Sequence, residues 1–305
     1  MVKEYVSKLI ENLPDNIKNV NSPQIIDLVL DGGIFNGSYL IGALYFLKEM
    51  EKQNYIKINR ISGCSIGSIA AFLYFIDSLD LMSQLYIIAN KEFKETHKLK
   101  TVKELKQYLI KHIPNDICDK VNNNLFITYY NIKKGEKRIK SKFKDIDEII
   151  DTIIKSCFIP YLIDGNILYQ SKYIDGINPF IFNKEHNSKI LYLDLFGYDK
   201  IGNLLNIKNE KTNYHRILSG MLDIHTFFIK QSNTSMCSFV NEWNYINLFN
   251  IYLKYIIEKI VVYFTCVLIY FENKFSVEFK SSIVSKIVIK IIQDVFVIIL
   301  ETYCI

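Results

Sequence analysis

Gly63-Cys64-Ser65-Ile66-Gly67 lies between Ile58 to Ser62, whose pattern is that of a strand, and the apolar run Ile69 to Ile76. A strand, a sharp turn and a helix are therefore expected in succession, with the serine at the turn. Glycines flank the serine because so tight a turn does not admit a Cβ beside it. The following helix directs its unpaired N–H groups and the positive end of its dipole at Ser65. This stretch predicts a serine nucleophile.

The composition indicates a globular protein. The chain has 305 residues, of which half are apolar and 23% charged, enough for one large or two small domains. The net charge of +5 is modest, and the lysines are scattered along the sequence. A solvated surface is the usual reason for such a distribution, so we expect no nucleic-acid partner.

The cysteines predict neither a metal site nor disulfides. No Cys-x-x-Cys occurs, and no cysteine is spaced from a histidine as zinc ligands are. No cofactor is expected. Charges at Lys3, Glu4 and Lys8 exclude the apolar core of a signal peptide. We therefore expect free thiols in a reducing compartment, hence a cytoplasmic protein, with peripheral attachment to membranes as an option.

The first part of the chain alternates strand and helix patterns. Ile25 to Leu30 is apolar enough for a strand buried on both faces. A loop over Asp31 to Gly37 and an amphipathic helix over Ser38 to Gln53 follow. With the strand at 58–62 and the helix at 65–76, this order predicts an α/β fold with a mainly parallel sheet.

Further elements are expected along the rest of the chain. A short N-terminal helix ends at Pro14, and a linker occupies 19–23. The remaining patterns predict helices over 79–93, 102–113 and 147–157, a hairpin of 125–132 with 137–143, and a strand over 190–196. We divide the chain into 1–24 (N-terminal helix and linker), 25–200 (catalytic core) and 201–305 (a helical C-terminal region on the core or a membrane).

Two long apolar segments near the C-terminus, Ile251 to Phe271 and Ile283 to Leu300, are interrupted by charges. The longest uncharged stretch, Ile260 to Phe271, is about half of the roughly 20 residues that a membrane-spanning helix needs. Packing helices are the first expectation, and helices lying in a membrane interface are the alternative.

The loop over Asp31 to Gly37 could supply what a serine nucleophile needs besides a base, namely convergent N–H groups for an oxyanion. It follows the first buried strand, at the edge where open α/β sheets bind ligands. Its glycines, Gly32, Gly33 and Gly37, do not follow the Gly-x-Gly-x-x-Gly spacing. Nucleotide binding is therefore not expected.

Taken together, the motifs resemble those of the patatin-like phospholipase family. The family has a glycine-rich loop after its first strand, a Gly-x-Ser-x-Gly turn roughly thirty residues later, and an Asp-Gly-Gly/Ala motif about a hundred residues beyond. Here these are 31–37, 63–67 and Asp175-Gly176-Ile177. The flanking segments 156–160 and 178–179 also look like the family's. The resemblance covers residues 25 to 200 and implies a three-layer α/β/α core, with extra helices at the C-terminus.

The resemblance also implies the roles of residues. Ser65 would be the nucleophile and Asp175 its base, without a histidine. The N–H groups of Gly32, Gly33 and Ile34 would form the oxyanion hole. The other motif glycines are Gly37, Gly63, Gly67 and Gly176.

This chain departs from the family's pattern at Ile34 (usually glycine), Asn36 (usually a basic residue) and Ile177 (usually Gly or Ala). The change at Ile34 bears on the conformation of the loop, since isoleucine still offers an N–H. The change at Asn36 removes a charge near it. Asp164 is a rival base, but its Asp-Gly-Asn context is that of a tight turn.

The function that follows is a lipid acyl hydrolase acting on phospholipids or other acyl lipids, and we expect it to work at a membrane surface. One alternative is an esterase with a Ser–Asp–His triad, completed by His215 or His225. Another is a catalytically weak relative that has kept the fold and binds membranes.

Overall fold

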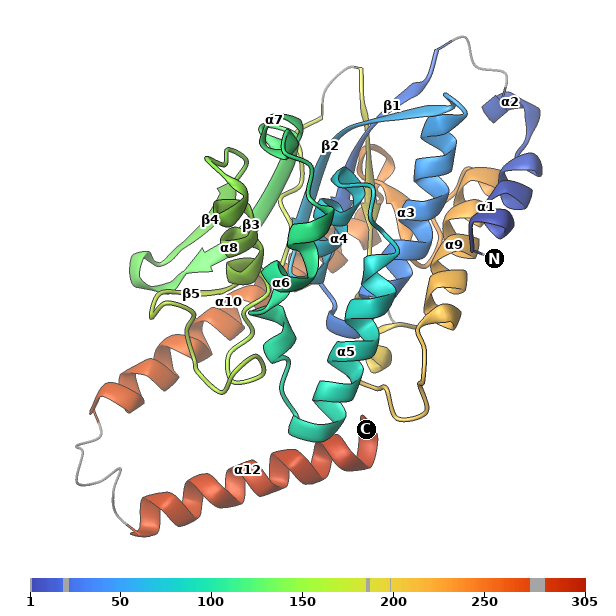
Figure 1. Cartoon of the computed structure of the whole chain (residues 1–305). Helices are drawn as coiled ribbons and strands as arrows, with labels where there is room; N and C mark the ends of the chain where they lie inside the picture. Colours follow the sequence, from blue (N-terminus) through green and yellow to red (C-terminus); the bar gives the residue numbers. More distant parts are fainter. Residues whose placement is uncertain (1, 19–21, 185–186, 198, 275–282) are drawn as a thin grey trace.

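The computed structural model describes residues 2–18, 22–184, 187–197, 199–274 and 283–305 (Figure 1). Residues 19–21 of the predicted linker lie outside the described residues. Two helices, α1 (Val2–Glu11) and α2 (Asp15–Lys18), precede the first strand. Val6, Leu9 and Ile10 of α1 are buried, so the predicted N-terminal helix packs on the domain.

The described strands form one seven-stranded sheet with the order β4-β3-β2-β1-β6-β7, and β5 pairs with β3. The four central strands, β3-β2-β1-β6, are parallel, whereas β4, β5 and β7 are antiparallel to their neighbours. The predicted mainly parallel central sheet is confirmed. The bounds are β1 Gln24–Leu30, β2 Ile56–Cys64, β3 Leu125–Asn131, β4 Glu136–Lys140, β5 Tyr173–Asp175, β6 Lys189–Leu193 and β7 Cys237–Phe239.

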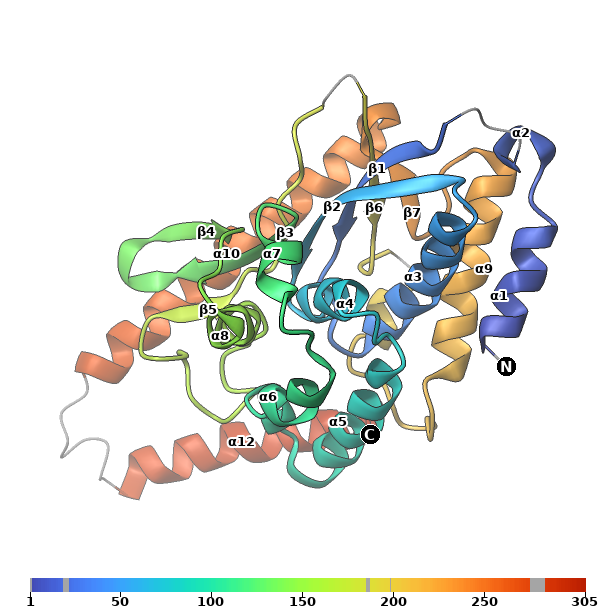
Figure 2. The same cartoon turned by 45° about the horizontal axis from the view of Figure 1, so that its top comes forward.

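Helices cover both faces of the sheet. Ile26, Leu28 and Leu30 of β1 belong to a core that includes residues of α3 (Gly37–Lys52), α4 (Ile66–Phe75) and α9 (Tyr214–Lys230). Val29 points the other way, into a smaller core against which Ile251 packs. Ile251 lies in α10 (Tyr245–Lys274), which runs behind the sheet in Figures 1 and 2. This alternation along β1 produces the three-layer α/β/α arrangement.

Five further helices lie in the described residues, and one of them, α8, packs against β3 and β5. They are α5 (Leu81–Thr96), α6 (Leu105–Leu109), α7 (Ile117–Val121), α8 (Ile146–Ser156) and α12 (Ile283–Tyr303). The segment predicted as one helix over 102–113 is instead two 3₁₀ turns with α6 between them. Tertiary contacts override the local pattern there, because the Glu92 carboxylate accepts hydrogen bonds from the N–H and hydroxyl of Thr101 at 2.9 and 2.6 Å.

The C-terminal part contains both predicted long helices, α10 and α12. None of the described helices is long and apolar enough to cross a membrane. The chain beyond residue 200 also contributes α9, which packs in the main core, and β7, which pairs with β6. The division of the chain at residue 200 stays a prediction.

Candidate active site

Ser65 occupies the turn between β2 and α4. Its backbone angles, φ +49° and ψ −131°, are ones that non-glycine residues rarely adopt. Its N–H donates to the Ser156 hydroxyl oxygen at 2.9 Å, and that hydroxyl donates to the Thr128 carbonyl at 2.6 Å. The last residue of α8 therefore ties the strained turn to β3. Only 6% of Ser65 is exposed.

Strand register brings Asp175 to the same point of the sheet. Strand β3 pairs with β2 as far as Thr128 opposite Cys64, and then with β5 from Tyr129 opposite Asp175. Because Ser65 follows Cys64 directly, both predicted catalytic residues lie where β5 takes over from β2 along the edge of β3. The side chains of Asp175 and Ser65 share a hydrogen bond.

The environment of Asp175 suits a base. Burial raises the pKa of its carboxyl to about 6, although the hydrogen bond with Ser65 and the N–H of Ile177, which donates to Oδ1 at 2.7 Å, act in the opposite direction. The backbone N–H of Asp175 donates to the Phe158 carbonyl at 2.9 Å. A carboxyl that titrates near pH 6 is mostly ionised at neutral pH and can still accept a proton.

The glycine loop packs directly on the turn. A Cβ built on Gly32 would lie 3.2 Å from the Ser65 Cβ, so only glycine allows this approach without displacement. The N–H of Gly32 donates to Oδ1 of Asp31 at 2.9 Å. Within the described residues, the N–H groups of Gly33 and Ile34 donate to no protein acceptor. They are the loop's available donors for an oxyanion.

The other motif glycines permit close packing of backbone. A Cβ on Gly67 would lie 2.6 Å from the Asp31 carbonyl oxygen, which lets α4 begin against the end of β1. At three other glycines a Cβ would also be too close to its neighbours. Gly63 lies against the backbone of α4, Gly37 against the side chain of Ile66, and Gly176 against the Thr128 carbonyl.

Two of the three departures from the family pattern are residues in the left-handed region. Ile34 has φ +47° and Ile177 has φ +60°. A β-branched side chain is unfavourable there, whereas the family's usual glycine is not. The chain therefore carries the strain of an isoleucine with positive φ at both positions.

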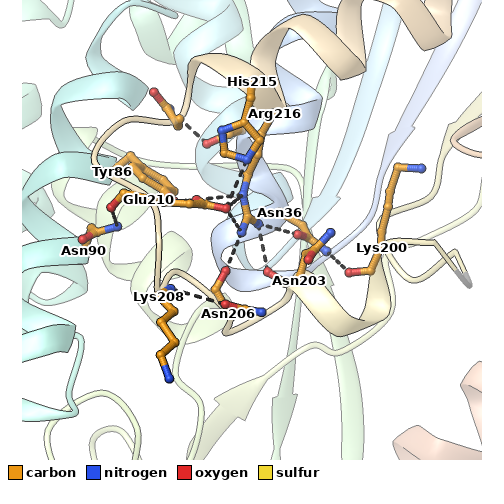
Figure 3. Close-up of polar contacts among 12 residues, drawn as sticks. Asn36, Tyr86, Asn90, Lys200, Asn203, Asn206, Lys208, Glu210, His215 and Arg216 are labelled. Atoms are coloured by element: carbon orange, nitrogen blue, oxygen red, sulfur yellow. Dashed lines mark hydrogen bonds and ion pairs between the residues drawn. The ribbon is translucent and has the colours of Figure 1, made fainter. Parts of the chain in front are cut away.

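The third departure, Asn36, contacts an arginine from another helix (Figure 3). Its Oδ1 accepts from Nη1 of Arg216 at 2.6 Å, and its Nδ2 donates to the carbonyls of Leu195 and Lys200. Arg216 is fully buried in α9 and also binds the carboxylate of Glu210 at 2.8 to 3.1 Å. A guanidinium thus lies next to the glycine loop although position 36 itself is uncharged. No local sequence signal connects Arg216 with Asn36.

The rival residues lie in other contacts. Asp164 accepts the N–H of Asn166 at 2.9 Å and pairs with Lys103 at 2.9 Å, as expected for a turn residue. His215 lies 3.1 Å from Glu210, and His225 packs its ring on Phe46. Neither histidine has a contact with Ser65 or Asp175 among the described residues.

Cys64, next to the serine, is fully buried, and its thiol donates to the Ile177 carbonyl at 3.3 Å. Burial raises the pKa of this thiol well above its usual value. All six cysteines are free, at positions 64, 118, 157, 237, 266 and 304.

An apolar cavity opens at Ser65. Its wall is formed by Ile34 and Phe35 of the glycine loop, by Ile66 and Ile69 of α4, and by side chains of α5 and of the segment after α8. The side chains of α5 are Met82, Leu85 and Ala89. Leu99, Val102 and Leu105 come from the segment between α5 and α6 and from the start of α6, and Cys157, Ile159 and Ile163 follow α8. Such a lining accommodates a hydrocarbon chain.

Comparison with known proteins agrees with these motifs. A model of the patatin-like phospholipase family matches residues 28–180, half of the chain. The chain belongs to this family, as the motifs predicted.

Relatives within the family are distant. The chain is 26% identical over 153 residues to 1-acylglycerol-3-phosphate O-acyltransferase Pnpla3 of Mus musculus, an alignment covering 47% of this chain and 37% of that protein. It is 24% identical over 136 residues to omega-hydroxyceramide transacylase of Homo sapiens, covering 42% and 26% respectively. The matched parts thus span between about a quarter and two fifths of these relatives' length. Among solved structures, VipD from Legionella pneumophila has a TM-score of 0.32 at 12% identity, covering 56% of this chain and 49% of that one.

Proposed function

We propose that this chain is a lipid acyl hydrolase that cleaves fatty-acyl esters of membrane lipids with Ser65 as nucleophile and Asp175 as base. The observation that carries the proposal is the strained turn at Ser65, which shares a hydrogen bond with a buried carboxyl of raised pKa. Membership of the patatin-like phospholipase family supports an acyl lipid as substrate.

In the proposed reaction, the Ser65 oxygen attacks the ester carbonyl and its proton passes to the Asp175 carboxylate. The N–H groups of Gly33 and Ile34 and the N-terminus of α4 stabilise the oxyanion. Gly32 stays a proposed third donor, and its N–H donates to Oδ1 of Asp31 in the structure. Collapse of the tetrahedral intermediate releases the alcohol, which takes the proton from Asp175. Water activated by Asp175 then hydrolyses the acyl-serine and frees the fatty acid.

The apolar cavity beside Ser65 is the proposed acyl-chain site. Isoleucine, leucine and phenylalanine side chains line it from the nucleophile to α5, so a fatty-acyl chain would place its ester carbonyl at Ser65. Residues 25–200 form the proposed catalytic core, and 201–305 the region that packs on it.

The exposed apolar side chains of α10 support contact with a membrane surface. Tyr245 is 91% exposed and Tyr263 is 73% exposed. Three more large apolar side chains of this helix are 60 to 62% exposed, namely Tyr252, Ile260 and Phe264. Large apolar side chains gathered on one helix mark an interaction surface more often than a solvated one. Replacing Tyr263 and Phe264 with glutamate should reduce sedimentation of the protein with phospholipid vesicles.

The proposal is tested with a panel of phospholipids and neutral acyl lipids presented to the wild type and to Ser65→Ala. Fatty-acid release by the wild type, abolished in a folded Ser65→Ala variant, is expected. Undiminished release by that variant would refute the role of Ser65.

Acyl transfer is a second candidate, because the named relatives are an acyltransferase and a transacylase. In that reaction the acyl-serine would pass its acyl group to a lipid hydroxyl in place of water. Adding a lysophospholipid or a hydroxylated lipid to the same assay separates the two: transfer yields a new acylated lipid, whereas hydrolysis yields only free fatty acid.

A further inference from the structure

Helix α10 sends two charged side chains into the protein, one turn apart. Lys254 and Glu258 occupy the same helical face, and their side chains are 12% and 3% exposed. Neighbours at this spacing commonly pair with each other, but here each binds a different segment near Ser65. Lysine and glutamate side chains are rarely buried unless they are paired, so the partners of these two residues bear on their role.

Lys254 contacts the residue that begins the glycine loop. Its Nζ lies 2.6 Å from Oδ2 of Asp31, 2.9 Å from Oδ1 of Asp194 and 3.2 Å from the hydroxyl of Tyr192. The other oxygen of Asp31 accepts the N–H of Gly32, the glycine packed against Ser65. A chain of contacts thus runs from α10 through Asp31 to the rest of the glycine loop.

Glu258 contacts the segment that carries the base. Its Oε2 accepts from Nδ2 of Asn178 and from Nζ of Lys137, both at 2.8 Å. Asn178 follows Asp175 by three residues, and its side chain also donates to the Lys254 carbonyl at 3.1 Å. The same turn of α10 therefore holds both loops of the proposed site.

We propose that Lys254 and Glu258 are positioning residues of the catalytic site. Lys254 fixes the glycine loop (residues 31–37) through Asp31, and Glu258 fixes the segment that carries the base (residues 175–178) through Asn178. This inference rests on the proposed function. It also makes α10, which lies beyond the predicted catalytic core, necessary for full activity. Neither residue touches the reacting atoms.

The charge of Lys254 matters as well as its contacts. Burial raises the pKa of Asp31 to about 6, and the Lys254 ammonium acts against that rise. Burial alone would lower the pKa of Lys254, but the carboxylates of Asp31 and Asp194 raise it. The charge on Asp31 in turn raises the pKa of Asp175, and Lys137 lowers it. The other groups facing Asp31 are Tyr192 and Cys64.

The test compares Lys254→Met with Lys259→Met, which removes an exposed lysine from the same helix. Lys254→Met is expected to lower kcat about 10²-fold, because misplacing catalytic groups by about 1 Å has effects of that size. Its KM should stay unchanged. Lys254→Arg, which keeps the charge, should restore part of the activity. Lys259→Met should match the wild type.

Asn178→Ala provides a second variant. It removes the hydrogen bonds between α10 and the segment that carries the base without changing charge. This variant is used if Lys254→Met does not fold. It is expected to lose kcat while its KM stays unchanged. Wild-type kcat in the folded variants, or no recovery of kcat in Lys254→Arg, would overturn the inference. Wild-type protein that releases no fatty acid and does not react at Ser65 would instead overturn the proposed function.

Discussion

The buried carboxyl of Asp175 should make the active protein less stable than a neutral variant. Its pKa rises from 3.8 to about 6, mainly through burial. When the pKa of a carboxyl is higher in the folded state than in the unfolded state, ionising that carboxyl lowers the free energy of unfolding. The penalty is absent below pH 3.8, grows as the pH rises, and is complete above the folded-state pKa. Asp175→Asn keeps the shape of the side chain and removes the ionisation.

The size of this effect follows from the shift. Each pKa unit corresponds to about 1.36 kcal/mol, so holding the carboxylate ionised at pH 7 costs about 3 kcal/mol. At pH 5, where the folded protein is mostly protonated, the same linkage gives about 1.5 kcal/mol. With an unfolding entropy of about 2.1 cal/mol/K per residue, the change at pH 7 corresponds to an increase in Tm of about 5 °C.

Thermal and urea unfolding of the wild type and Asp175→Asn at pH 7 and pH 5 measures this directly. The variant should lose about 10²- to 10⁴-fold in kcat, the usual contribution of a general base, while gaining stability. Asp164→Asn is the matched control: that carboxyl pairs with Lys103 and caps a turn, so its removal should give no gain. A Tm at pH 7 equal to or below that of the wild type would refute the reasoning, as would a gain that does not shrink at pH 5.

Further outcomes are expected. The acidic limb of kcat/KM should lie near pH 6, with activity falling about tenfold per pH unit below it, because the base must be ionised; a limb near pH 4 contradicts this. Ile177→Gly should be more stable than Ile177→Ala by about 1 kcal/mol in urea unfolding, since only glycine relieves the positive φ. Ser156→Ala should lose about 1–3 kcal/mol by the same assay, because two buried backbone groups lose their partner. Replacing His215 and His225 together with glutamine should leave kcat unchanged, whereas a triad enzyme would lose activity.

The sequence predicted the elements whose signals are local. The strand pattern before 63–67 gives β2 and the apolar run after it gives α4, and the turn at 134–136 gives the hairpin of β3 and β4. Helix α8 begins at a side-chain cap, where Asp145 accepts the N–H of Glu148 at 2.8 Å, and acidic residues fill its first turn. In each case the pattern and the turn chemistry agree with the final structure.

The sequence could not predict elements and contacts that depend on distant partners. Strand β5 has three residues, and only its pairing with β3 makes it a strand. Helix α9 has the amphipathic pattern of a packed helix but follows a stretch without clear signals. Lys254 was visible only as a charge interrupting an apolar helix. Its partner Asp31 lies 223 residues earlier, and no local pattern links the two.

The departures from the family pattern show a similar division. Sequence comparison within the motif identified Ile34, Asn36 and Ile177 as unusual, and the positive φ of both isoleucines gives the physical meaning of two of them. The buried guanidinium beside Asn36 comes from Arg216, which packing of α9 on α3 brings to the loop. A contact of this kind is a property of the fold, because the two positions are 180 residues apart.

The central claim is that Ser65 is an activated nucleophile. The most direct measurement is reaction of the folded protein with a fluorophosphonate, followed by mass spectrometry of the peptide that contains residues 63–67. A single adduct at Ser65, formed much more slowly in Asp175→Asn and absent in Ser65→Ala, is the expected result. An unlabelled wild type that is folded, or equal labelling of wild type and Ser65→Ala, would contradict the account.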